Sequence, residues 1–310
     1  MELIRGLHNL RPRHQGCVLT IGKFDGVHNG HKAVLANVLK RAEQLGLPAT
    51  VMVFEPQPEE VFAPATAPAR LSTLSEKYRL LKAAGVDRLL CVRFNQAFAR
   101  QRADTFIHDL LVDKLGVRFL VVGDDFRFGQ GREGDFEMLQ QAGQKYGFEV
   151  VSTQSFRVDD CRISSTAVRH ALEQGDFART ASMLGRPYSI QGRVVHGEKK
   201  GRTIGFPTAN VLLKRFRTPL RGVFAVTVKI AEQYYTGVAN VGKRPTLNGQ
   251  RTQLEVHIFD FTGDLYGQTI DVIPRTKLRD EHKFDSFEAL KNQIQADAIQ
   301  ARHYFKKTDS

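Results

Sequence analysis

The chain has 310 residues, enough for two domains, and its 42% hydrophobic and 25% charged residues are ordinary for a globular protein. It has no apolar run long enough to span a bilayer and no apolar segment after Met1, so we expect a cytoplasmic protein with no membrane partner. The three cysteines, Cys17, Cys91 and Cys161, lack metal-ligand spacing, which favours reduced thiols over a metal site.

Most of the positive charge lies in the second half of the chain. Lys and Arg outnumber Asp and Glu by 24 to 21 up to Leu184 and by 21 to 12 beyond it, which gives net charges of +3 and +9. A basic domain attracts nucleic acid, acidic membranes or nucleotide phosphates. Because the basic residues are scattered and no known nucleic-acid module is present, the pattern favours small phosphorylated ligands over nucleic acid.

The first half alternates buried strands with amphipathic helices. Strands are expected at 18–21, 49–54, 89–94, 117–122 and 148–151, and helices at 31–45, 75–84, 104–115 and 135–146. This alternation predicts an α/β, Rossmann-like domain whose parallel sheet is covered on both faces. Ligands of such sheets bind beyond the carboxyl ends of the strands, where residues 22–31 and 123–129 lie.

The second half has a different period. Residues 224–230, 255–259 and 270–278 alternate between apolar and polar positions and are separated by Gly, Pro and Asn turns. They predict a small antiparallel β-barrel followed by a C-terminal helix. In that helix, Phe287, Leu290, Ile294 and Ile299 are spaced to cover a barrel face. The helical pattern ends near Gly185 and Pro187, which predicts domains at 1–184 and 185–310.

Residues 22–31, GKFDGVHNGH, follow the first buried strand and open a helix. The glycines permit tight turns and close approach of a nucleotide, and the helix N-terminus offers N–H groups to phosphate. His28 and His31 are three residues apart and would project from one side of the first turn. The alternative is a strand–helix turn with surface histidines, but such a turn does not require glycines, an acidic residue and two histidines together. The predicted site residues are Gly22, Phe24, Asp25, Gly26, His28 and His31.

Two further segments of the first half are candidate phosphate sites. In residues 162–169, RISSTAVR, three hydroxyl groups lie between two arginines at a helix start, whereas simple capping needs only one hydroxyl. The candidates there are Arg162, Ser164, Ser165, Thr166 and Arg169. The turn at 123–129 adds Asp125, although Asp–Gly turns are also common at strand ends for structural reasons.

Residues 197–210, GEKKGRTIGFPTAN, combine a basic glycine loop with Thr208 and Asn210. Two oxygen ligands two residues apart can face one Mg²⁺, which bridges ATP phosphates. The loop is not a P-loop, because no Gly-Lys-Ser/Thr leads into a helix. Its predicted phosphate-binding residues are Gly197, Lys199, Gly201, Arg202, Thr203 and Gly205.

Glu255 begins an otherwise apolar strand, where an acid is unexpected. It is either one half of a structural ion pair or a functional base, and the residues alone do not favour one over the other. His257 has no such context, and we expect it to be structural.

These motifs resemble those of the bifunctional bacterial riboflavin kinase/FMN adenylyltransferases (FAD synthetases), over nearly the whole chain. Residues 22–31 are similar to that family's His-x-Gly-His nucleotidylyltransferase motif, and residues 54–58, 123–129 and 162–169 to its further nucleotide-site motifs. Residues 201–210, 240–246, 254–257 and 264–267 are similar to its flavokinase motifs. Val53, Gln57 and Phe224 depart from the more usual Thr, His and Tyr.

The resemblance implies a riboflavin kinase in the barrel. ATP with Mg²⁺ would phosphorylate riboflavin to FMN, with Thr208 and Asn210 as metal ligands and Glu255 accepting the hydroxyl proton. Arg279 and Glu281 would lie beside the flavin.

For the N-terminal nucleotidylyltransferase domain, the resemblance implies that FMN attacks the α-phosphorus of a second ATP. FAD and pyrophosphate would form while His28 and His31 stabilise charge. The implied partners are riboflavin, FMN, FAD and ATP. Two alternatives explain fewer of the motifs. A different transferase would not account for the barrel motifs. A non-enzymatic flavin or nucleic-acid binder would not account for Thr208, Asn210 and Glu255 together.

Overall fold

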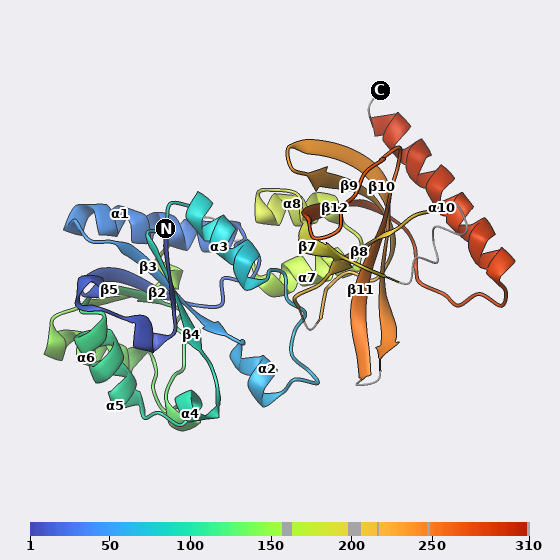
Figure 1. The fold of residues 1–310 in the computed structure, drawn as a ribbon. Helices are drawn as coiled ribbons and strands as arrows, with labels where there is room; N and C mark the ends of the chain where they lie inside the picture. The colour runs from blue at the N-terminus through green and yellow to red at the C-terminus, as the bar shows by residue number, and fades with distance from the viewer. Residues whose placement is uncertain (157–162, 198–205, 216, 247–248, 309–310) are drawn as a thin grey trace. The chain divides into compact units, whose positions relative to one another are not determined.

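The computed structural model of the chain describes residues 1–156, 163–197, 206–215, 217–246 and 249–308. Contacts divide it into two compact units (Figure 1). The first unit comprises Met1–Pro68 and Leu74–Ser164, and the second comprises Ala69–Thr73 and Ser165–Ser310. In the described part of the chain, no helix has the length and apolarity needed to cross a membrane.

The first unit contains a six-stranded parallel sheet in the order β1-β4-β3-β2-β5-β6. The five predicted strands are confirmed as β2 (Cys17–Ile21), β3 (Ala49–Glu55), β4 (Arg88–Arg93), β5 (Val117–Val122) and β6 (Glu149–Ser152). The outermost strand, β1 (Glu2–Arg5), was not predicted. It has four residues, of which only Ile4 is buried, so it lacks a hydrophobic period.

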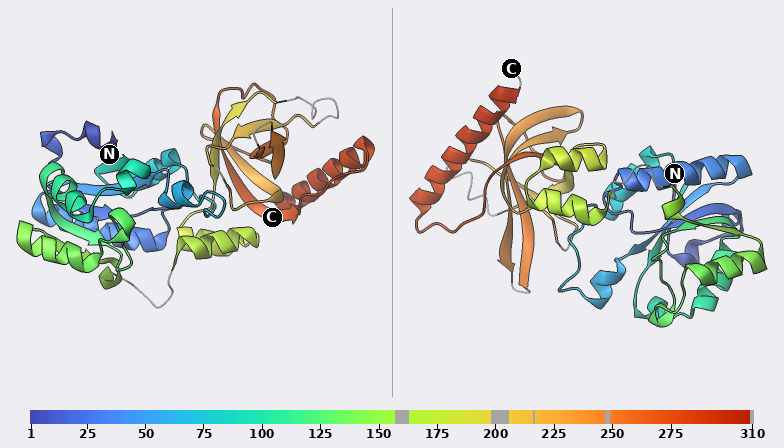
Figure 2. Two further views of the ribbon diagram at one scale, coloured as in Figure 1. Left: turned by 90° about the horizontal axis from the view of Figure 1, so that it is seen from below. Right: turned by 180° about the vertical axis from the view of Figure 1, so that it is seen from behind.

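Helices cover both faces of this sheet, as predicted. One face packs against the π-helix η3 (Phe106–Lys114) and α6 (Phe136–Tyr146), and the other against α1 (Asn29–Leu45) and α3 (Leu74–Ala83) (Figures 1 and 2). Leu19 faces the η3 and α6 side while its neighbour Val18 faces α1, as the period of a strand requires. The shorter helices are α2 (Pro58–Phe62), α4 (Gln96–Ala99), α5 (Ala103–Thr105) and the 3₁₀ turns η1 (Leu7–Asn9), η2 (Pro12–His14), η4 (Gln130–Arg132) and η5 (Thr153–Phe156).

The second unit is built around a closed antiparallel barrel in the order β10-β11-β8-β7-β12-β9, which confirms the predicted architecture. Its strands are β7 (Ile190–Val195), β8 (Ala209–Leu212), β9 (Gly222–Ile230), β10 (Gln233–Thr246), β11 (Gly249–Ile258) and β12 (Thr269–Arg279). Strands β9 and β12 contain two of the segments predicted from alternation, and β11 contains all but the last residue of the third, 255–259. The other three are too short or too irregular in apolar period to stand out.

The C-terminal helix α10 (Phe287–Thr308) packs beside the barrel (Figure 2), but only part of the predicted face is covered, since Leu290 and Ile294 are half-buried. Ala298 and Ala301 are its buried apolar residues, in one cluster with Ala225 and Phe259 of the barrel unit. Phe287 and Ile299 are 59% and 69% exposed, so the prediction that they cover the barrel was wrong. The helix instead uses small alanines in its second half, which allow its backbone to approach the strands closely.

Helices α7 (Ser165–Glu173) and α8 (Phe177–Leu184) precede the barrel in the chain and belong to the same compact unit. The ring of Phe177 in α8 meets that of Phe224 in β9, with centroids 5.9 Å apart. The contact boundary at Ser164/Ser165 therefore lies before these helices, whereas the sequence pattern placed the domain boundary after them. The division of function at 184/185 stays a prediction.

Residues Ala69–Thr73, here called the crossing segment, belong to the second unit although they lie within the first half of the chain. Arg215 donates from Nη1 to the carbonyl oxygens of Arg70 and Leu71, at 3.3 and 3.2 Å, and to Oη of Tyr188 at 2.9 Å. Arg169 donates from Nε to the carbonyl oxygen of Ala69 at 2.5 Å. Hydrogen bonds from arginine side chains therefore hold the crossing segment within the second unit.

Candidate active sites

The loop between β2 and α1, residues 22–28, has a strained backbone. Phe24 and Val27 have positive φ angles of 45° and 42°, and Gly26 lies between them at 80°. Positive φ costs a non-glycine residue roughly 1–3 kcal/mol. The side chains of Phe24 and Val27 are buried in the core, which holds them in this conformation, and Asp25 is fully buried beside them. The loop is thus a preorganised structure at the carboxyl end of β2.

His28 and His31 meet at the N-terminus of α1. His28 is the N-cap, and its Nδ1 accepts a hydrogen bond from the backbone N–H of His31 at 3.3 Å. The two rings stack with centroids 3.7 Å apart and planes at 17°, and the Phe24 ring lies 4.9 Å from that of His31. Because Nδ1 of His28 accepts this bond, the ring N–H is carried by Nε2.

His31 is held in its neutral form. Burial lowers the pKa of His31 well below its ordinary value of 6.5, and electrostatic interactions with His28 and Lys77 lower the pKa further. Its Nδ1 is buried and has no hydrogen-bond partner among the described residues. Two imidazoles at a helix N-terminus can donate N–H groups to an anion, alongside the backbone amides of the first turn.

The other predicted residues of the first half are divided between the two units. A Cβ added at Gly30 would lie 3.0 Å from the carbonyl oxygen of Ile163, so the backbone next to Ser164 reaches the N-terminus of α1. Asp125 is exposed in the turn after β5, the strand beside β2. Ser165, Thr166 and Arg169 begin α7 in the second unit. Arg162 lies outside the described residues.

A row of phenylalanines lines the carboxyl ends of β3, β4 and β5, and the sequence analysis missed it. Consecutive ring centroids are 5.0–6.4 Å apart. Phe62 of α2, at one end of the row, is 58% exposed. The sequence did contain a signal for this row, because several of these phenylalanines lie at or just after the end of a predicted strand. The members of the row are Phe62, Phe94, Phe54, Phe98, Phe106, Phe128 and Phe126.

In the barrel, Glu255 of β11 pairs with Asn210 of β8 on one side and Asn240 of β10 on the other. Directly opposed residues share one face of an antiparallel sheet, so the three side chains form a row across three strands. Gln253 lies two residues before Glu255 on the same face. Its amide donates to Oε1 of Glu255 at 3.1 Å and to Oδ1 of Asn210.

This row has the donor set of a divalent-metal and phosphate site. Oδ1 of Asn240 is buried without a hydrogen-bond partner in the described structure, and such an acceptor calls for a cation or a donor. Thr208 is exposed one residue before β8 and two residues from Asn210. Hydroxyl, amide and carboxylate oxygens are the ligands that Mg²⁺ prefers.

The glycine loop begins against this row. A Cβ added at Gly197 would lie 2.1 Å from Nδ2 of Asn210. The other predicted loop residues, Lys199, Gly201, Arg202, Thr203 and Gly205, lie outside the described residues. Nδ1 of His257 lies 2.9 Å from the carbonyl oxygen of Pro207, which is consistent with the structural role expected for it.

Arg279 is the last residue of β12 and Glu281 lies two residues beyond it, and both have intramolecular partners. The guanidinium of Arg279 forms a two-pronged ion pair with the buried carboxylate of Asp297 in α10, with N–O distances of 2.8–3.1 Å. A Cβ added at Gly242 of β10 would lie 1.8 Å from Oε1 of Glu281. Arg279 therefore docks α10 on the barrel, and Glu281 adjoins β10 two residues beyond Asn240.

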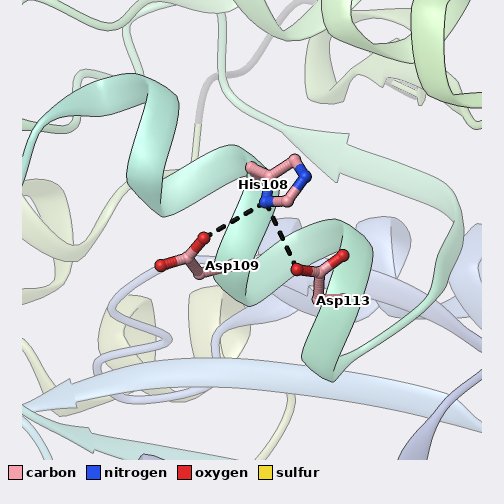
Figure 3. A group of neighbouring side chains, drawn as sticks. All are labelled: His108, Asp109 and Asp113. Carbon is pink, nitrogen blue, oxygen red and sulfur yellow. Dashed lines mark hydrogen bonds and ion pairs between the residues drawn. The ribbon is translucent and has the colours of Figure 1, made fainter.

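A further polar cluster lies on η3 (Figure 3). Nδ1 of His108 is 3.2 Å from carboxylate oxygens of both Asp109 and Asp113, and all three side chains are exposed. A π-helix, which bonds residue i to i+5, brings His108 and Asp113 together. The carbonyl oxygen of Asp113 accepts a bond from Gln15, just before β2, so the cluster lies toward the amino ends of the strands, away from His28. We interpret it as a surface ion-pair group.

Comparison with known proteins agrees with this geometry. Residues 10–167 match the family model for FAD synthetase, and residues 184–305 match that for riboflavin kinase. The chain is 56% identical over 310 residues to the bifunctional riboflavin kinase/FMN adenylyltransferase of Escherichia coli strain K12, with 99% of each chain covered. The protein of the same name from Pseudomonas fluorescens is 53% identical over 303 residues, with 97% of each chain covered.

A solved structure shares the fold. It is described as a macrolide-efflux protein from Streptococcus pneumoniae, and it matches with a TM-score of 0.74 and 33% identity over 96% of this chain and 97% of its own. The parallel-sheet unit, the barrel unit and the matches over both halves agree with the resemblance found in the motifs. The chain belongs to the family of bifunctional riboflavin kinases/FMN adenylyltransferases.

Proposed function

We propose that the enzyme makes FAD from riboflavin in two ATP-dependent steps, with FMN formed at the Glu255 row and adenylylated at the His28–His31 stack. The observation that carries this proposal is the presence of both sites on one chain. Each site lies in the segment that matches the corresponding family model, FAD synthetase for the stack and riboflavin kinase for the row.

In the kinase step, the 5′-hydroxyl of riboflavin attacks the γ-phosphorus of ATP and ADP leaves. Glu255 accepts the hydroxyl proton, and the Gln253 amide orients the carboxylate through its bond to Oε1. Thr208 and Asn210, with the unpartnered oxygen of Asn240 nearby, would hold a Mg²⁺ ion that neutralises charge on the ATP phosphates. Gly197 leaves room for a phosphate loop to start directly against Asn210.

In the adenylylation step, a phosphate oxygen of FMN attacks the α-phosphorus of a second ATP and pyrophosphate leaves. FMN already carries a charged oxygen, so the enzyme needs no nucleophile of its own. His28 and His31 donate N–H groups to the phosphate oxygens, and their stacking fixes both donors before the substrate arrives. The phenylalanine row offers ring faces to the isoalloxazine of FMN, with Phe62 exposed at its end.

We also propose that the enzyme works in the cytoplasm without a nucleic-acid or membrane partner. The net charge of +12 then serves to attract ATP and FMN, both of which are anions.

The test is to incubate the protein with riboflavin, ATP and Mg²⁺ and to separate the flavins by chromatography. FMN should form first and FAD should follow, with two ATP consumed per FAD, and a chelator should stop FMN formation. FMN supplied with ATP should give FAD directly. Folded protein that yields neither product would refute the proposal.

A further inference from the structure

The neighbours of Asn240 in the barrel cannot satisfy its buried carbonyl oxygen. Oδ1 of Asn240 has no hydrogen-bond partner among the described residues. The residue opposite it on β9 is Val223, which has an apolar side chain. The residue opposite it on β11 is Glu255, and an ionised carboxylate accepts hydrogen bonds but donates none. An unsatisfied buried acceptor is costly, and a ligand that brings a donor removes that cost.

Asn240 lies between the proposed base of the kinase and the residue expected beside the flavin. Its Cβ atom is about 4.5–5.5 Å from that of Glu255, because the two residues are directly opposed. Gly242, two residues further along the same face of β10, is the position against which the carboxylate of Glu281 packs. In riboflavin, the ribityl chain likewise connects the reacting 5′-hydroxyl to the ring system.

The register of the barrel favours a hydroxyl donor over the metal ion as the partner of Asn240. Asn210, one of the two predicted metal ligands, opposes Glu255 from β8, on the other side of β11 from Asn240. Neighbouring strands are about 4.8 Å apart, so β8 and β10 are separated by roughly 9–10 Å. Magnesium binds its ligands at only about 2.1 Å. An ion held by Thr208 and Asn210 therefore lies toward the far side of Glu255.

We propose that Asn240 binds the 4′-hydroxyl of riboflavin, with Oδ1 accepting its hydrogen, and that this bond makes the kinase selective for a hydroxyl at that position. The inference rests on the kinase site proposed above. The 4′-hydroxyl is the neighbour of the reacting 5′-hydroxyl, as Asn240 is the neighbour of Glu255. Fixing C4′ restricts the rotation of the last carbon, which holds the 5′-hydroxyl toward the base.

The test compares riboflavin with 4′-deoxyriboflavin as substrates of the full-length enzyme. The wild type should prefer riboflavin about tenfold in kcat/KM, because the deoxy analogue leaves Oδ1 of Asn240 unsatisfied. Asn240→Leu keeps the shape of the side chain and removes the acceptor. Its preference should fall below threefold, mainly through lost activity on riboflavin. The two substrates and two enzymes form a double-mutant cycle that isolates this one contact.

Two controls accompany the comparison. Asn292→Leu makes the same substitution at an exposed position of α10 and should keep the wild-type preference. Conversion of added FMN to FAD by the same samples should be unchanged in both variants. The Mg²⁺ concentration that gives half-maximal phosphorylation should also be the same for Asn240→Leu and the wild type.

Three results would overturn the proposal. One is a wild type that phosphorylates both flavins equally well, which can be observed even if Asn240→Leu does not fold. Another is an Asn240→Leu enzyme that retains the wild-type preference, since another group would then recognise the hydroxyl. The third is a raised Mg²⁺ requirement with an unchanged preference, as a metal ligand would give. Phosphorylation of riboflavin by the wild type, which tests the proposed function, is independent of all three.

Discussion

Replacing Arg215 by methionine tests how strongly the crossing segment is held. Arg215 is 7% exposed, and its Nη1 donates hydrogen bonds to the carbonyl oxygens of Arg70 and Leu71 and to Oη of Tyr188. A hydrogen bond to a charged group contributes about 1.5–3 kcal/mol. All three bonds come from Nη1, which carries two hydrogens. Only the bond to Tyr188, at 2.9 Å, has a near-optimal length, and the two carbonyl bonds are longer, at 3.2 and 3.3 Å. The methionine stem still fills space and the acceptors left behind are neutral, so we expect a loss of about 1.5–3 kcal/mol, the range for hydrogen bonds to a charged group.

The assay is urea unfolding followed by circular dichroism and, in parallel, by residual FMN formation after exposure to each urea concentration. The unfolding transition that abolishes FMN formation should move to lower urea. Tyr188→Phe is the matched control, because it removes one hydrogen bond and no charge and should cost about 1–2 kcal/mol. An Arg215→Met enzyme within about 1 kcal/mol of the wild type would refute the reasoning, since the crossing segment would then be held by other contacts.

Three further predictions address the two reactions and the boundary between the units. Glu255→Gln should reduce FMN formation by about 10²–10⁴ because the base is lost, while added FMN is still converted to FAD; equal loss of both activities would indicate misfolding instead. His28→Ala or His31→Ala should reduce FAD formation by about 10²–10³ and let FMN accumulate, and an unchanged adenylylation rate would make these histidines structural. A fragment of residues 165–310, which retains α7 and α8, should form FMN and no FAD and should unfold at a higher temperature than residues 185–310; equal melting temperatures would contradict the contact boundary.

Much of the fold could be predicted because apolar residues recur with the period of the element that they form. Strand β2 is buried at every position, as expected for the centre of a parallel sheet, and its neighbours β3 and β5 are buried at most positions. The docking face of α10 could not be predicted in this way. The apolar residues of α10 lie on several faces of the helix, so periodicity alone does not show which face contacts the barrel. Ala298 and Ala301 are buried there and the larger Ile299 is exposed, because small side chains permit closer packing.

The candidate sites also differ in whether local sequence could predict them. Residues 22–31 form their candidate site locally, since the loop, the cap and the first turn of α1 are continuous in sequence, and so the motif could predict it. Gln253 had no such signal. It reaches Asn210 only through the register of β11 against β8. Tertiary structure creates this relation, and local sequence does not encode it.

The close approach of Gly197 to Asn210 limits how the kinase site can change under selection. Glycine has no smaller replacement, and any Cβ at this position would overlap Nδ2 of Asn210, whose Oδ1 is held by Gln253. Every mutation of Gly197 must therefore displace a side chain that we expect the kinase to need. Consider an inhibitor that binds against Gly197 and Asn210. A mutation of Gly197 that weakened its binding would also damage the enzyme, so resistance mutations would have to arise elsewhere in the site.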